Sequence, residues 1–271
     1  MTITSAFYKT LFIAAAALLI GTAYFVSSAP EASALTSLSS VDAGDLIRGE
    51  AYSAVYYYGA DGFRYVFPNS NTYFTWYDNF DTVIFISDAD LATIQIGGNV
   101  TYKPGVKMIK IQSDPRTYAV APGGTLRHVG SEAIATAMYG ASWNTMIDDL
   151  ADGFFTNYTI GTAIASSSDF VPATVEASVS DIGDDKELVT PEDISITDSG
   201  YTPLDVTINP GAGVRFTNNG SENHTATADD LSWGSGTISP GGSFIRTFNE
   251  TGTYGFFDSY DSTNSGAVYV D

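Results

Sequence analysis

The last part of the chain alternates short apolar runs with turn-forming residues, and this pattern leaves few folds open. Between the runs lie the turn sequences NPGAG, NNGSEN and SPGGS. The runs are rich in β-branched and aromatic residues and cover 193–196, 204–208, 213–218, 224–228, 243–248, 252–257 and 266–270. About seven short strands in roughly eighty residues are typical of a β-sandwich, which we therefore predict for residues 190–271.

An internal near-repeat constrains the preceding part of the chain. AVYYYGADGFRYVFPN (54–69) aligns with TYAVAPGGTLRHVGSE (117–132), and this alignment gives Arg64 and Arg127 the same place in two predicted hairpins. A helix candidate capped by Ser or Asn follows each hairpin. Neither copy can bury an apolar face alone, so residues 45–161 are predicted to form a duplicated α+β module. The whole chain is expected to be mainly β with some α.

The segment between the module and the sandwich has a different composition. Residues 162–189 are rich in Ala, Ser, Val and acidic residues, contain few aromatics and are interrupted by Pro172. This composition predicts an extended linker.

The N-terminal residues 1–34 have the pattern of a secretory signal peptide. Lys9 precedes an apolar run over 11–20, and small residues at 32–34 offer a cleavage site after Ala34. We expect a secreted, extracellular or cell-surface protein. An uncleaved anchor is the alternative, although the run is shorter than the about 20 residues of a spanning helix. Membrane contact is expected only through this segment, if at all.

Charge and composition limit the partners. The net charge of −20 comes from 31 acidic against 11 basic residues, which leaves no basic face for phosphates and argues against nucleic acid. The chain has no cysteine, so it forms neither disulfides nor a thiolate-bound metal site. Envelope or surface components, either glycans or other proteins, are the expected partners.

Two family resemblances follow from these segments. VYYYGADGFRYVFPN and GGNVTYKPGV resemble an uncharacterised module of secreted bacterial surface proteins, a resemblance that implies no chemistry. VTINPGAGVRFTNNGSENHT, ISPGGSFIRTF and GTYGFF resemble the cupredoxin family, the plastocyanin-like blue-copper domains, over about residues 193–271. The second resemblance implies a Greek-key β-sandwich whose ligand loops cluster at one end.

The cupredoxin resemblance also points to candidate metal positions. In that family one His precedes Thr or Ser after a central strand, and Cys, His and Met lie on the last loop. His224 matches the first ligand, whereas Asp258, Asp261 and Asn264 stand where the other three would fall. A blue-copper centre needs a thiolate, so this chain cannot form one.

Two interpretations of these four positions remain open. Polar residues replaced the ligands when copper was lost, and His224 is now hydrogen-bonded at the end of the sandwich; this is the interpretation that we favour. Alternatively, His224, Asp258 and Asp261 hold divalent copper or zinc, or the oxygens of Asp258, Asp261 and Asn264 hold calcium.

No pattern in the chain indicates catalysis. Its two histidines, His128 and His224, lie in different predicted domains, and neither a GxSxG elbow nor a phosphate loop occurs. We expect a non-enzymatic structural or adhesive protein without a cofactor, carrying a degenerate, copper-free cupredoxin-like domain. The alternatives are a copper-binding or electron-transfer cupredoxin, and a carbohydrate-binding surface protein that uses aromatics such as Tyr57 and Trp76.

Overall fold

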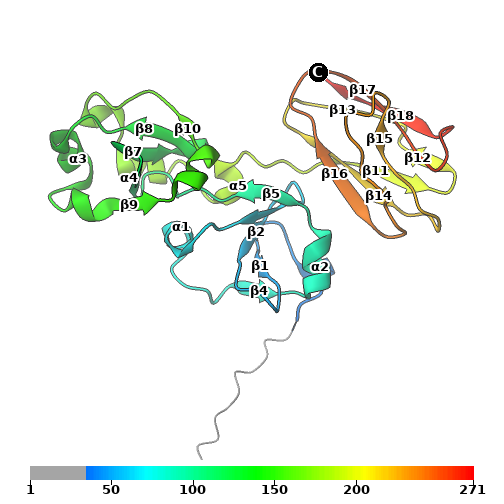
Figure 1. Cartoon of the computed structure of the whole chain (residues 1–271), viewed down its shortest axis with the longest axis horizontal. Helices are drawn as coiled ribbons and strands as arrows, with labels where there is room; N and C mark the ends of the chain where they lie inside the picture. Colours follow the sequence, from blue (N-terminus) through cyan, green and yellow to red (C-terminus); the bar gives the residue numbers. More distant parts are fainter. Residues whose placement is uncertain (1–34) are drawn as a thin grey trace, which may run out of the picture. The chain divides into compact units, whose positions relative to one another are not determined.

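A computed structural model describes residues 35–271, and the predicted signal peptide lies outside them (Figure 1). These residues form four sheets joined by short helices, so the expectation of a mainly β chain with some α is confirmed. No helix within 35–271 has both the length and the apolar character needed to span a membrane.

The first copy of the repeat forms a five-stranded sheet in the order β4-β1-β2-β3-β5. Its central strands are antiparallel neighbours, and β4 and β5 add to the two edges in parallel. The elements are η1 (Leu38–Ser40), β1 (Leu46–Arg48), β2 (Tyr56–Tyr58), β3 (Arg64–Val66), α1 (Ser70–Trp76), β4 (Val83–Phe85), α2 (Asp88–Thr93) and β5 (Ile96–Asn99).

The second copy repeats this topology strand for strand: its order, β9-β6-β7-β8-β10, corresponds to β4-β1-β2-β3-β5 of the first copy. Here too an antiparallel meander carries one parallel strand at each edge. The elements are β6 (Met108–Ile111), β7 (Asp114–Ala121), η2 (Pro122–Gly124), β8 (Thr125–His128), α3 (Glu132–Tyr139), η3 (Trp143–Met146), β9 (Ile147–Leu150), η4 (Asp152–Asn157) and β10 (Thr159–Ile160). The predicted duplication is therefore confirmed, and it extends beyond the hairpin and helix.

The strand register corrects the predicted alignment of the hairpins by one residue. Tyr57 pairs with Tyr65 in the first copy, and Ala119 pairs with Arg127 in the second. Tyr57 belongs to the core cluster that contains Tyr73 of α1, and Ala119 belongs to the cluster that contains Ala135 of α3. Because a shift of one residue moves a side chain to the other face of the sheet, Arg127 takes the place of Tyr65 and not that of Arg64.

The expectation that residues 162–189 are extended is wrong. The segment contains three short helices, η5 (Ser167–Asp169), α4 (Pro172–Glu176) and α5 (Ile182–Asp185). Phe170 joins a core cluster of the second copy, and Ile182 joins the core of the first. Burial of these apolar side chains stabilises the folded conformation of the segment, although its sequence has no sustained hydrophobic periodicity that would predict a helix.

The C-terminal residues form a β-sandwich of two four-stranded sheets, β12-β11-β14-β16 and β13-β18-β17-β15. All seven predicted strands form, and Gly200–Thr202 adds one that the sequence pattern did not predict. The strands are β11 (Glu192–Thr197), β12 (Gly200–Thr202), β13 (Asp205–Ile208), β14 (Gly213–Asn218), β15 (Thr227–Ala228), β16 (Ser243–Thr247), β17 (Gly252–Phe257) and β18 (Ser265–Val270).

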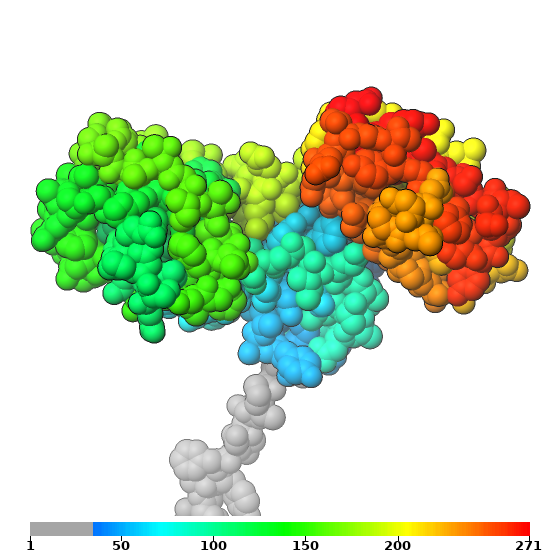
Figure 2. Space-filling model, turned by 45° about the horizontal axis from the view of Figure 1, so that its top comes forward, coloured from blue at the N-terminus to red at the C-terminus, as the bar shows by residue number. Residues whose placement is uncertain are grey.

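The core of the sandwich lies between these two sheets. Phe216 of β14 meets Phe256 of β17 edge to face, with ring centroids 5.0 Å apart. Ile194 and Val268 are fully buried in the same cluster. Drawn as spheres, the side chains close the gaps that the ribbon leaves open (Figure 2). A rigid core of this kind fixes the ends of β14 and β17, where the candidate site begins.

Candidate functional site

His224 lies in the loop that follows β14, and the backbone of this loop is pinned on both sides. His224 and Ile238 exchange two backbone hydrogen bonds, of 3.1 and 2.8 Å. The buried Asn218 side chain donates to the carbonyls of Glu222 (2.8 Å) and Ile238 (2.7 Å). The imidazole is thereby held inside the end of the sandwich, with 4% of the residue exposed.

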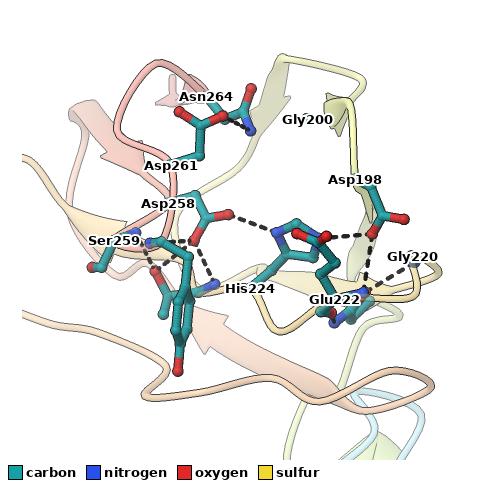
Figure 3. Close-up of polar contacts among 12 residues, drawn as sticks. Asp198, Gly200, Gly220, Glu222, His224, Asp258, Ser259, Asp261 and Asn264 are labelled. Atoms are coloured by element: carbon teal, nitrogen blue, oxygen red, sulfur yellow. Dashed lines mark hydrogen bonds and ion pairs between the residues drawn. The ribbon is translucent and has the colours of Figure 1, made fainter.

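Asp258 follows β17 directly, is fully buried and meets the imidazole (Figure 3). Its Oδ2 lies 2.6 Å from His224 Nδ1. Its Oδ1 accepts hydrogen bonds from the backbone N–H groups of Thr225 and Tyr260, both at 3.0 Å, and from the Thr225 hydroxyl at 3.3 Å. Both oxygens of the buried carboxylate thus have hydrogen-bond partners, as a buried charge requires.

Asp198 completes the surroundings of the imidazole, and the sequence analysis missed it. It lies in the turn between β11 and β12, and its Oδ1 is 3.3 Å from His224 Nε2. The same carboxylate accepts from the backbone of Ser221 (2.9 Å) and Glu222 (3.1 Å) and from the Ser221 hydroxyl (2.7 Å). Gly220 makes room for it, since a Cβ there would lie 2.3 Å from Oδ1.

The two carboxylates favour a charged imidazole. Burial by itself lowers the pKa of His224, but the hydrogen bonds to Asp258 and Asp198 outweigh it and raise the pKa above the ordinary value of 6.5. Hydrogen bonds from Ser221 and Glu222, with a smaller effect of His224, lower the pKa of Asp198 to about 2. In its protonated form the imidazole can donate from both nitrogens, one to each of the two carboxylates.

Asp261 and Asn264, the other two predicted positions, make no hydrogen bond to the imidazole. The Asp261 side chain accepts from Thr263 N (3.1 Å), from Thr263 Oγ1 (2.7 Å) and from Asn264 Nδ2 (3.4 Å). The Asn264 carbonyl accepts from the backbone N–H of Asp258 at 3.0 Å. Both residues therefore shape the loop that presents Asp258.

The donor set does not fit a copper centre. Both ring nitrogens, the atoms that would bind a metal, already face carboxylates, and the chain offers no thiolate. Within residues 35–271 no group of three or more His, Cys, Asp or Glu side chains is arranged to hold an ion. The arrangement can hold a proton between carboxylates, and it joins three loops at one end of the sandwich.

The other candidates from the sequence have structural surroundings. Tyr57, proposed for a sugar-binding face, is buried, and its hydroxyl accepts from Gly183 N at 3.1 Å. Trp76 donates from Nε1 to the Thr101 carbonyl at 2.8 Å. His128 pairs across the hairpin with Tyr118.

Comparisons with known proteins identify similar structures only. A scan against family models finds no match, and no curated protein matches. A purple cupredoxin from Nitrosopumilus maritimus is 26% identical, over 30% of this chain and 99% of that one, with a TM-score of 0.28. Amicyanin from Paracoccus versutus is 23% identical over 30% and 81%, with a TM-score of 0.28. A copper-containing nitrite reductase from Thermus scotoductus is 19% identical over 31% and 23%, with a TM-score of 0.29.

The first two of these neighbours are cupredoxins, the family that the C-terminal residues resemble. The sandwich is defined by its own strand order and by the core between its two sheets. The predicted resemblance of residues 45–161 to a bacterial surface module has no support among the comparisons.

Proposed function

We propose that this protein is a non-enzymatic structural or adhesive protein of the cell exterior, with a cupredoxin-like sandwich that works without copper. One observation carries the proposal. Both ring nitrogens of His224 are engaged by carboxylates, Nδ1 by Asp258 at 2.6 Å and Nε2 by Asp198 at 3.3 Å.

Metal binding at His224 would have to overcome three costs. The ion would displace a proton from an imidazole whose pKa is raised, and affinity falls when a ligand holds its proton more tightly. It would also break the bond to Asp258, leaving a fully buried carboxylate without its cationic partner. Finally, no thiolate is available to compensate through a short metal–sulfur bond.

The exterior location is supported by sequence features. Lys9, the apolar run over 11–20 and the small residues before Leu35 have the pattern of a secretory signal. A net charge of −20 keeps such a protein soluble and repels anionic surfaces. We therefore place its partners among surface glycans or proteins.

Nuclear magnetic resonance of the two histidines tests the site. Long-range proton–nitrogen spectra of the purified protein at pH 6 should give both ring nitrogens of His224 as protonated, and His128→Asn assigns the signals. Copper and zinc titrations, followed by elemental analysis and spin resonance, should find no stoichiometric ion in the wild-type protein or in His128→Asn. One equivalent of copper that is lost in His224→Asn would refute the proposal in favour of a metal-binding cupredoxin.

Cell fractionation tests the location separately. The protein should be found in the medium or be accessible to protease on intact cells, with a mature chain that begins at Leu35. Recovery from the cytosol with residues 1–34 still attached would contradict an exterior role.

A further inference from the structure

A polar cavity of about 340 Å³ is lined by the duplicated module and by the segment 162–189 that follows it, remote in sequence from His224. Side chains from β3, from the segment after β5, from η4 and from the end of α5 line it. They include Tyr65, Thr101, Asn157, Asp185 and Lys186. The cavity therefore gathers hydroxyl, amide, carboxylate and ammonium groups from segments that are far apart in the chain.

Lys186 brings an ammonium group to this cavity without a carboxylate partner. Within residues 35–271, no carboxylate lies within ion-pair distance of its Nζ. The ammonium instead lies over the ring of Tyr65, 4.9 Å from the centroid. Burial lowers the pKa of Lys186. The position over the ring therefore places the N–H donors of Lys186 at the cavity without an ion-pair partner among residues 35–271.

Asp185, the neighbouring residue, supplies acceptors. It is 3% exposed, yet its carboxylate accepts only from the backbone N–H of Gly123 (2.9 Å) and the Thr101 hydroxyl (3.5 Å). Each oxygen thus has one partner, and because a carboxylate has about four lone-pair sites, Asp185 can accept further hydrogen bonds from a ligand. Burial raises the pKa of Asp185, although the hydrogen bond from Gly123 and the charge of Lys186 act in the opposite direction.

Two further residues extend the donor and acceptor set. The side-chain oxygen of Asn157 accepts from Asn99 at 3.1 Å, which fixes the amide and leaves its N–H groups free to donate. Glu187 lines the rim in a left-handed backbone conformation, φ 54°, which residues other than glycine rarely adopt. Strained conformations of this kind cluster at binding sites.

The mixture of charges limits the chemical class of ligand. A ligand carboxylate or phosphate would meet the ammonium, but it would also face Asp185 and Glu187. A cation would be repelled by Lys186. A neutral polyhydroxyl compound avoids both repulsions, because each of its hydroxyls can accept from Lys186 or Asn157 and donate to Asp185.

We propose that this cavity binds a sugar residue of a neutral glycan, with Lys186 and Asn157 donating to its hydroxyls and Asp185 accepting from them. The site is independent of the His224 group, and it differs from the Tyr57 and Trp76 surface suggested by the sequence. The proposed exterior role explains where a glycan would be met, but the binding test does not depend on that role.

Titration of the full chain with neutral monosaccharides and disaccharides, followed by the amide resonances of Thr101 and Gly123, tests the proposal. At least one saccharide should shift these resonances. Lys186→Met and Asp185→Asn should each weaken that binding by about tenfold or more, since each removes hydrogen bonds made by a charged group. Lys110→Met is the matched control, because Lys110 pairs with Asp149 on an exposed surface; its binding should equal that of the wild type.

Melting curves of the variants separate a lost contact from a lost fold, and Lys186→Met is the decisive variant where Asp185→Asn is unstable. The proposal is overturned if no saccharide shifts the cavity resonances, or if binding survives both substitutions. It is also overturned if glycine, acetate or inorganic phosphate shifts the same resonances and saccharides do not. A failure here leaves the histidine and copper measurements unaffected.

Discussion

Replacing Asp258 by Asn gives a direct measure of the group that surrounds His224. The carboxylate is fully buried and accepts four hydrogen bonds. Asn keeps the oxygen that accepts from Thr225 and Tyr260, but its amide N–H₂ then faces His224 Nδ1. The imidazole can meet this donor only in its neutral form, with the remaining proton on Nε2 toward Asp198.

The expected loss follows from the type of bond that is exchanged. A hydrogen bond to a charged group contributes about 1.5–3 kcal/mol, and a neutral one about 0.5–1.5 kcal/mol. Asp258→Asn should therefore cost the sandwich about 1–2 kcal/mol at pH 6. Asp258→Ala leaves the buried donors without any acceptor, and it should cost about 3–5 kcal/mol.

The dependence on pH has a defined sign. Because the pKa of His224 is raised in the folded protein, its contribution to stability is fully present below the unfolded value of 6.5. The contribution is lost as the pH rises through the folded value. The stability difference between the wild type and Asp258→Asn should therefore be largest below pH 6.5 and should shrink toward alkaline pH.

Urea unfolding followed by amide resonances of β14 and β17 measures this difference, because these signals observe the sandwich separately from the duplicated module. Asp230→Asn, in a turn capped through Ser232, is a control that should leave the pH dependence unchanged. An Asp258→Asn variant as stable as the wild type at pH 6, or a difference that grows above pH 8, would refute the imidazolium.

Three further predictions concern the same end of the sandwich and can be followed by the same amide signals. The pKa of Asp198 is lowered from 3.8 to about 2, so its contribution to folding stability is present above pH 3.8 and is lost as the pH falls toward 2. The wild type should therefore lose more stability over this interval than Asp198→Asn. Parallel curves of stability against pH for the two proteins would argue against the hydrogen bonds of Asp198. Gly266→Ala places a Cβ 2.0 Å from the Leu204 carbonyl, so it should cost about 3 kcal/mol or more; an unchanged urea midpoint would mean that β13 and β18 are not paired as described. Asn218→Ala removes a buried amide that makes three hydrogen bonds, with an expected loss of about 2–4 kcal/mol, and a loss below about 0.5 kcal/mol would show that the His224 loop is held by other contacts.

Local patterns were sufficient to predict the strands of the sandwich. Each run alternates or concentrates β-branched and aromatic residues between strong turn signals, as in 213–218 and 252–257. The strand Gly200–Thr202 was not predicted because a three-residue segment that begins with glycine is too short to show a hydrophobic alternation. It is defined by its pairing with β11, which is information from the tertiary structure.

The outer strands of the duplicated module were not predicted for a related reason. β4, β5, β9 and β10 pair in parallel with strands distant in the chain, and parallel pairing leaves no hairpin signal. The fit of Phe170 and Ile182 into two different cores was equally invisible in a stretch without periodicity.

The candidate site could be predicted in part. The resemblance placed His224 and Asp258 together, and the structure agrees. Asp198 was missed because no ligand position of the resembled family falls on it. The pairing of Ile196 with Asn218 places the residues just beyond these two strand ends side by side, but this pairing is visible only in the tertiary structure. The polar residues 198 and 220–222 occupy those places.

The closed ring of donors and acceptors around His224 has a consequence for how the domain matures. A domain completed by a metal ion depends on the supply and correct loading of that ion, whereas His224 needs only a proton from the solvent to donate to both Asp258 and Asp198. The pH of the medium, which acts on every chain at once, would then determine whether this end of the domain is complete, as the supply of a metal ion does in a metal-binding domain.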